Sequence, residues 1–201
     1  EKVVIPMLQH IGAPCDPLVK KGDTVKVGQI IGDSEKFVSA PVHSSVSGTV
    51  TNLVTELFPG GFQVTSVEIK TDGVQEIHES IKPVSYSSNK ELIEAIRRSG
   101  LVGLGGAGFP AHVKLSPPPD KVVDTLIING AECEPYITSD YREIIENSWN
   151  IIGGINILKE LLKVKNVLIG IEDNKPEAIK ILTHLAEKID NVKVIKLKSR
   201  Y

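Results

Sequence analysis

The chain has 201 residues, of which 41% are hydrophobic and 24% charged, and its formal net charge is -2 at pH 7. This composition allows one large or two small hydrophobic cores and excludes a fibrous or disordered chain. Because no block of lysine and arginine forms a basic stripe, nucleic acid is not an expected partner. No apolar run approaches the roughly 20 residues that span a bilayer.

The first part of the chain is rich in β-branched residues that are interrupted by turn signals. Short runs such as TVKV and GTVTNLV alternate polar and apolar residues, and Gly-Asp and Ser-Gly pairs separate them at short spacing. This pattern predicts a small all-β barrel or sandwich over residues 1–72, with no helix. Residues 73–87 form a polar connector after it.

The pattern changes at Ser88, where we expect a helix to begin. Ser88 and Glu91 form an S-x-x-E capping box, and apolar residues then recur at the helical period. Gly100 stands where a helix C-terminal cap is expected. One short helix should therefore end at a glycine-rich segment.

Strand and helix patterns alternate over the rest of the chain. This order predicts a parallel sheet with right-handed crossovers, in an α/β domain that covers residues 88–201. The long helix is expected to be interrupted at the pair Gly153–Gly154. The predicted elements are a strand over 122–129, a helix over 142–163, a strand over 166–171, a helix over 175–189 and a strand over 192–197.

Residues 100–114, GLVGLGGAGFPAHVK, place five glycines within nine residues. The part GLGGAG satisfies the G-x-G-x-x-G fingerprint of dinucleotide sites. A helix is expected before it, however, and Pro110 and then a strand are expected after it, so a Rossmann site is disfavoured. The loop also lacks the G-K-[ST] ending of a P-loop.

A glycine turn of this kind can still bind an anion through its exposed backbone N–H groups. Lys114 would supply the counter-charge, and Phe109 would offer a flat apolar surface on which an aromatic ring system could stack. The alternative is a tight turn between packed elements, with Phe109 in the core. Five glycines followed by a phenylalanine and a lysine favour the ligand site.

Two further polar loops follow the first two strands of the predicted sheet. Asn129, Glu132 and Glu134 come after the first strand, and Glu172, Asp173 and Lys175 come after the second. Ligands of open α/β sheets bind at the carboxyl ends of strands, so the three loops could line one crevice. The alternative is that the acidic residues only favour helix N-termini electrostatically.

The cysteines and histidines predict no metal site in this sequence. Cys15 and Cys133 are far apart and show no C-x-x-C spacing, which indicates neither a disulfide framework nor an iron-sulfur site and suits a reducing compartment. His10 and His43 have no partner at metal-ligand spacing, so we expect them to be structural.

Three ordered motifs resemble one protein family. GLGGAGFP followed by a lysine, then NGAECEP, then GIEDN, resemble the flavin-binding domain of the respiratory complex I subunit that oxidises NADH. They are more similar still to the C subunits of the Rnf complex, an ion-pumping ferredoxin:NAD oxidoreductase. The N-terminal segment resembles these C subunits too, and its pattern is similar to the barrel-sandwich hybrid of lipoyl and biotinyl carrier domains. It lacks the Met-Lys-Met context of the carriers, so Lys36 is not expected to be modified.

The resemblance implies a set of cofactor-binding residues. Asn129 and Glu172 would contact the flavin, Glu132 belongs to the same set, and Phe109 and Glu134 would help to seat NAD(H). No side chain need act as acid or base, because the flavin carries the chemistry. Leu104 and Ala131 replace an arginine and an aspartate of the complex I pattern. Without that arginine, the positive charge that balances the FMN phosphate would come mainly from Lys114. The FMN phosphate and ribityl chain would be held by Gly103, Gly105, Gly106, Gly108 and Lys114.

The implied function is that of an electron-transfer subunit. It would bind FMN and NAD(H) and pass electrons between NAD(H) and iron-sulfur clusters of a membrane-bound, ion-translocating ferredoxin:NAD oxidoreductase. Its partners would be ferredoxin and the other subunits, and it would lie peripherally on the cytoplasmic face of the membrane. Two 4Fe-4S clusters are expected in a further C-terminal region. The alternatives are a cobalamin-reductase-type flavoprotein of a microcompartment and a non-catalytic assembly scaffold.

Overall fold

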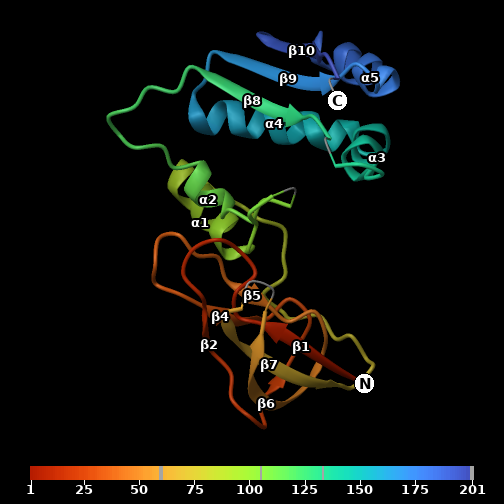
Figure 1. The fold of residues 1–201 in the computed structure, drawn as a ribbon. Helices are drawn as coiled ribbons and strands as arrows, with labels where there is room; N and C mark the ends of the chain where they lie inside the picture. Colours follow the sequence, from red (N-terminus) through yellow and green to blue (C-terminus); the bar gives the residue numbers. More distant parts are fainter. Residues whose placement is uncertain (59–60, 105, 133, 200–201) are drawn as a thin grey trace. The chain divides into compact units, whose positions relative to one another are not determined.

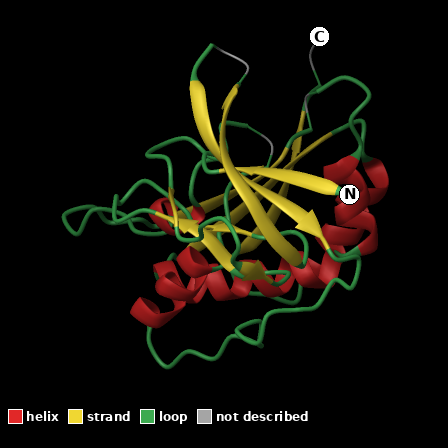
Figure 2. Ribbon diagram, turned by 90° about the horizontal axis from the view of Figure 1, so that it is seen from below, coloured by secondary structure: helices red, strands yellow, loops and turns green. Residues whose placement is uncertain are grey.

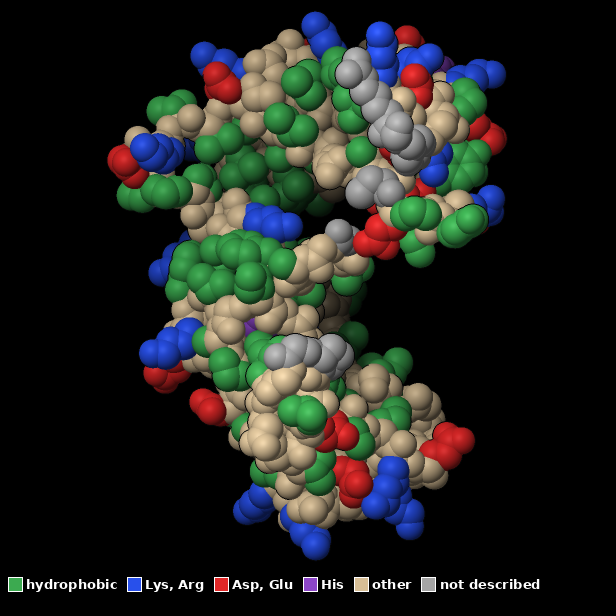
Figure 3. Space-filling view, viewed as in Figure 1, with side chains coloured by type: hydrophobic (Ala, Val, Ile, Leu, Met, Phe, Trp, Pro, Cys, Tyr) green, Lys and Arg blue, Asp and Glu red, His purple; other side chains and the backbone are tan. Residues whose placement is uncertain are grey.

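The computed structural model describes residues 1–58, 61–104, 106–132 and 134–199 (Figure 1). The chain forms two compact units, Glu1–Pro117 and Pro118–Tyr201. Acidic and basic side chains are interspersed over the face seen in Figure 3, as the small net charge suggests. Within the described residues, no helix has both the length and the apolar character of a membrane span.

Residues 1–72 form a β domain of two antiparallel sheets, as the sequence predicts (Figure 2). One sheet has the order β1-β7-β6-β3 and the other β2-β4-β5. Met7, Ile31 and Ile69 are among its fully buried side chains and belong to one hydrophobic core. The strands are β1 (Lys2–Pro6), β2 (Asp16–Pro17), β3 (Thr24–Val25), β4 (Ile30–Asp33), β5 (Val42–His43), β6 (Gly48–Leu57) and β7 (Gln63–Thr71).

The predicted helix after the connector is present as α1 (Asn89–Arg98). Ser88 is its N-cap, and the side chain of Ser88 accepts the backbone N–H of Glu91 at 3.2 Å. The Glu91 carboxylate accepts the N–H of Ser87 at 2.7 Å, so the reciprocal bond of the capping box is displaced by one residue. Gly100 has φ +70°, the left-handed conformation that ends a helix.

The helix α1 is anchored to the β domain, which places it in the first compact unit. Arg97 donates to Asp33 of β4 at 2.7 Å and to the carbonyl of Ser34 at 2.8 Å. The unit extends to Pro117 and so includes α1 and the glycine-rich segment, whereas we expected both in the C-terminal domain. The expected C-terminal domain, with its boundary at residue 88, stays a prediction.

A helical turn, α2 (Ala111–Lys114), follows Pro110 directly, so the prediction that a strand comes next is wrong. Pro110 has φ -58°, close to the value that its ring imposes, which suits the residue before a first turn. The N–H of Leu115 closes the turn onto the carbonyl of Ala111 at 3.0 Å. Four residues are too few to leave a periodic signal in the sequence.

The second unit contains the predicted parallel sheet, in the order β10-β9-β8. Val167, Ile169 and Ile171 of the central strand are at most 1% exposed and share one core with apolar residues of all three helices. Figure 1 shows α4 running alongside β8. The elements are β8 (Thr125–Gly130), α3 (Ser139–Glu146), α4 (Ser148–Leu162), β9 (Asn166–Glu172), α5 (Pro176–Ala186) and β10 (Val192–Leu197).

The expected helix interruption at Gly153–Gly154 is wrong, because α4 runs through both glycines. The break lies at Asn147, which ends α3 and caps α4 with φ -124° and ψ 27°. Its side-chain amide donates to the Glu143 carboxylate at 2.8 Å. Asparagine competes for local hydrogen bonds more effectively than glycine does, so it terminates the helix where glycine only weakens it.

Candidate functional site

The glycine-rich loop is closed at its base by backbone hydrogen bonds. The N–H of Gly103 donates to the carbonyl of Phe109 at 3.0 Å, and Val102 and Pro110 form an isolated antiparallel bridge. On the far side, the N–H of Ile11 in the β domain donates to the carbonyl of Ala107 at 3.2 Å. The loop therefore has a defined conformation set by its ends, with its glycines between them. Gly105 lies outside the described residues.

A pocket of about 670 Å³ lies between this loop and the β domain, within the first unit. Gly103, Gly106 and Gly108 line one side, and Pro41 and His43 line the other. A Cβ added to Gly106 would meet nothing within 4 Å, so its backbone faces open space. Gly108 has φ +64°, and a Cβ there would lie 3.2 Å from the Cα of His10. The positive φ and the close approach of His10 require glycine at position 108, whereas neither applies at Gly106.

Lys114 points its ammonium group at the loop. A Cβ added to Gly103 would lie 3.3 Å from Nζ of Lys114, and nothing in the described part of the chain forms an ion pair or hydrogen bond with that Nζ. The short helix α2 therefore brings a free cation to a loop of bare backbone. Phe109 is half-buried at the end of the same loop.

The histidines next to the loop are held by backbone groups. His10 accepts the N–H of Ala40 at 3.0 Å on Nε2, and its Nδ1 donates to the carbonyl of Ile11 at 3.2 Å. Nε2 of His43 donates to the carbonyl of Arg98 at 3.0 Å, and burial lowers the pKa of His43. Both rings position chain segments that border the pocket.

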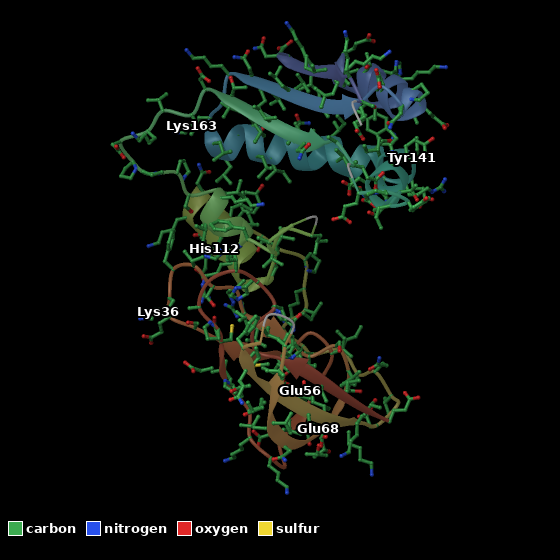
Figure 4. All side chains as sticks on the ribbon, in the orientation of Figure 1. Lys36, Glu56, Glu68, His112, Tyr141 and Lys163 are labelled. Carbon is green, nitrogen blue, oxygen red and sulfur yellow. The ribbon has the colours of Figure 1, made fainter. Side chains whose placement is uncertain are left out.

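His112, which the sequence analysis did not single out, is a residue of α2 (labelled in Figure 4) and anchors this turn to the chain around Phe37. Its ring is buried, and Nε2 donates to the carbonyl of Phe37 at 3.2 Å. The ring also meets Phe37 edge-on, with centroids 6.1 Å apart. Burial lowers the pKa of His112, so the neutral ring anchors the turn that carries Lys114. A lone histidine in sequence gives no sign of such a partner.

In the second unit, Glu132 is buried and bound on several sides. Its carboxylate accepts the N–H of Asp140 at 2.7 Å, at the start of α3, and pairs with the Lys175 ammonium at 3.0 Å. Burial alone would raise the pKa of Glu132, but the bonds from Lys175 and Asp140 outweigh it and lower that pKa. The alternative role at a helix N-terminus is thus observed, and a role in cofactor binding stays a prediction.

The Glu132–Lys175 pair joins the two polar loops at the carboxyl edge of the sheet. Lys175 also lies over the ring of Tyr141 of α3, with Nζ 5.4 Å from the centroid; Figure 4 labels Tyr141. Asp173 accepts the hydroxyl of Ser199 at 2.8 Å, and the bonds from Ser199 lower the pKa of Asp173. Lys175 is therefore a structural partner that the sequence pattern alone did not reveal.

Glu172, at the end of β9, has an unsatisfied acceptor. Its side chain is 8% exposed, and Oε2 is buried without a hydrogen-bond partner in the described residues. Asn129 and Glu134 are exposed, and the Asn129 side-chain oxygen accepts the N–H of Ala131 at 3.1 Å. Cys133 lies outside the described residues. The expectation of one crevice for all three loops stays a prediction.

Comparisons with known proteins agree with the motifs. A family model described as the Nuo51 FMN-binding domain matches residues 96–201, and one described as the RnfC barrel sandwich hybrid domain matches residues 1–74. The chain is 47% identical over its whole length to the C subunit of the proton-translocating ferredoxin:NAD(+) oxidoreductase complex of Clostridium ljungdahlii, and covers 44% of that protein.

Two other relatives are similar over the whole chain. The C subunit of the Na(+)-translocating ferredoxin:NAD(+) oxidoreductase complex of Acetobacterium woodii is 44% identical, and the chain covers 46% of it. The C subunit of the ion-translocating oxidoreductase complex of Pseudomonas aeruginosa is 40% identical, and the chain covers 26% of it. The chain thus spans less than half the length of the curated relatives it matches.

Proposed function

Because the chain belongs to the family of Rnf complex C subunits, we propose that it binds FMN and NAD(H) in an ion-translocating ferredoxin:NAD oxidoreductase. In that complex it would pass electrons between NAD(H) and iron-sulfur clusters, and the 4Fe-4S clusters would lie in a further region of the full-length protein. Ferredoxin, NADH and the other subunits would be its partners, at the cytoplasmic face of the membrane.

The observation that carries this proposal is the free Lys114 ammonium beside a loop of bare backbone. A phosphate group needs N–H donors and positive charge, and a glycine turn with a lysine supplies both. Gly106 faces open space, and Nζ of Lys114 stands near Gly103. Leu104, 93% exposed, supplies no charge where the complex I pattern has an arginine, so Lys114 would provide the main counter-charge.

The unsatisfied Oε2 of Glu172 supports the same proposal. A buried acceptor without a donor costs about 1–3 kcal/mol, and a ligand N–H or O–H group would remove that penalty. The exposed amide of Asn129 can donate to a second polar group. Phe109 and Glu134 would help to seat the nicotinamide nucleotide.

The flavin, once bound, would supply the hydride and single-electron chemistry. The chain's own residues have other tasks: the loop backbone and Lys114 hold the phosphate, and His112 keeps α2 in place. Glu132 and Lys175 hold α3 and the two polar loops together, which fixes the backbone around Asn129 and Glu172. None of these residues need transfer a proton.

The test is FMN binding by the purified full-length protein, measured by quenching of flavin fluorescence. Lys114→Met should weaken binding roughly ten- to a hundredfold, the value of one charge-assisted bond. Lys21→Met, which removes an exposed lysine of the same unit, is the matched control and should bind like wild type. NADH oxidation with an artificial acceptor should fall in parallel with FMN content.

Gly106→Ala separates ligand binding from folding. Its Cβ would meet no protein atom within 4 Å, so thermal stability should stay within about 2 °C of wild type. If the FMN phosphate lies against this backbone, however, the methyl group should reduce affinity at least tenfold. A full-length protein that binds no FMN, and in which both variants behave like wild type, would identify the chain as a non-catalytic scaffold.

A further inference from the structure

The first unit carries a second groove, lined in part by α1. It has a volume of about 590 Å³ and lies between the start of β4, the connector and α1. Its apolar lining includes Ile81 and Val84, which are 55% and 61% exposed. Lys82 and Arg98 line it as well, and His43 borders both this groove and the pocket at the glycine loop.

The start of the connector is held against the β domain next to the groove. The N–H of Val27 donates to the carbonyl of Glu76 at 2.8 Å, and Val27 and Ile77 form a parallel bridge. Lys26 pairs with Glu76 at 2.8 Å. Gly28 has φ +79°, and a Cβ there would come within 2.7 Å of Ile81, so only glycine lets the connector lie this close.

Glu91 and Glu94 of α1 line a neighbouring hollow that shares Arg98, and the two charged side chains of the groove itself, Lys82 and Arg98, are both cations. No acidic residue lines the groove, and within the described residues neither Lys82 nor Arg98 forms an ion pair. The adjacent Arg97, in contrast, is bound to Asp33. Glu94 lies one helical turn before Arg98, yet the two are not within ion-pair distance. The acids of the connector, Glu76 and Glu79, are paired with Lys26.

We propose that this groove docks an acidic, partly apolar peptide segment of another protein of the complex. Exposed apolar side chains beside unpaired cations are complementary to a segment that carries carboxylates next to apolar residues. The proposal rests on the membership of a multisubunit complex that the proposed function assigns.

The experiment places a photo-crosslinking amino acid at Val84 of the full-length protein in the assembled complex. Irradiation should join it to a peptide of another subunit that contains aspartate or glutamate, identified by mass spectrometry. The control position is Leu57, which is 74% exposed on β6 and does not line the groove. Crosslinks from Val84 only to lipid, only to its own chain or to a peptide without acidic residues, or no crosslink at all, would overturn the proposal.

Charge reversal tests the same contact without a probe. The double variant K82E/R98E should weaken association with the crosslinked partner about tenfold, and replacing the acids of the crosslinked peptide by lysine should restore it. Lys21→Glu is the matched control and should have no effect. If the double reversal does not fold, K82Q/R98Q should give a smaller loss of the same sign. Unchanged association in a folded variant would refute the docking role.

The two proposals can fail independently. FMN content and NADH oxidation should be normal in K82E/R98E, because neither side chain is assigned to the cofactor. A wild-type protein that contains no FMN but still crosslinks from Val84 to an acidic peptide would contradict the proposed function and support the docking groove. A flavin-containing protein with a wrong or missing crosslink would do the opposite.

Discussion

At the scale of single residues, the polar groups of the candidate site divide into two classes. Glu132 and Asp173 have their charges satisfied inside the fold, by Lys175 and by Ser199. Lys114 and Glu172, in contrast, have polar atoms without a partner in the described residues. Substitutions in the first class should therefore change stability first, and those in the second class should change ligand binding first.

Glu132→Gln should lower the free energy of unfolding by about 2 kcal/mol, because it removes the negative charge from a buried pair and leaves the Lys175 ammonium poorly compensated. Chemical denaturation of the purified protein measures this. Glu134→Gln is the control: the Glu134 side chain is exposed, and its replacement should stay within about 0.5 kcal/mol. Equal effects of the two substitutions would contradict the structural role of Glu132.

The same residue predicts a pH dependence. The pKa of Glu132 lies below its usual value in the folded protein, whereas in the unfolded chain it is about 4.3. The pair therefore contributes its full stability above about pH 4.3, and this contribution is lost as the pH falls through the folded pKa. The stability difference between wild type and Glu132→Gln should shrink in acid. A constant difference between pH 7 and pH 3 would show that the charge is not responsible.

At the scale of elements, the sequence predicts best where the pattern is long. The helix expected over 175–189 is found as α5, Pro176–Ala186, and the strand expected over 192–197 is found at those bounds. The turn α2 was missed because four residues carry no period. The helix break lies at Asn147 and not at the glycines, because glycine only lowers helix propensity, whereas asparagine competes for local hydrogen bonds.

In the candidate site too, the sequence predicts local features and misses contacts between distant residues. The glycine loop and Lys114 lie within fifteen residues of each other, so their association could be predicted from spacing alone. Lys175 and His112 act through partners 43 and 75 residues away in sequence, Glu132 and Phe37. No local pattern specifies such contacts, because they depend on how the elements pack.

The two glycines inside α4 give a prediction at this scale. Gly153 and Gly154 are exposed, and a Cβ at either would meet nothing within 4 Å. Alanine should therefore stabilise the protein by about 0.5–1 kcal/mol at each site, the propensity difference in a helix. Gly130→Ala is the contrast, since its Cβ would lie 2.9 Å from the carbonyl oxygen of Gly170 and should destabilise. Thermal denaturation of the three variants measures this, and destabilisation by the α4 substitutions would show that the glycines have another role.

At the scale of the whole molecule, the family models and the compact units divide the chain differently. The models match residues 1–74 and 96–201, whereas the first compact unit ends at Pro117. The glycine loop therefore has the β domain as its structural support, through Ile11, through His43 and through the Arg97–Asp33 pair. A substitution in the β domain that removes one of these contacts should therefore change the local stability of the loop.

Asp33→Asn tests this coupling. Asp33 lies on β4 and holds Arg97 at 2.7 Å, and both side chains are partly exposed, so losing the charge should make local opening of α1 and the loop easier by about 1 kcal/mol. Hydrogen exchange of the amides in residues 89–104 and 106–114 should then become about fivefold faster. Asp16→Asn is the matched control, because Asp16 is the register partner of Asp33 on β2 and forms no ion pair in the described residues. Unchanged exchange in Asp33→Asn, or equal acceleration in both variants, would mean that the loop does not depend on this anchor.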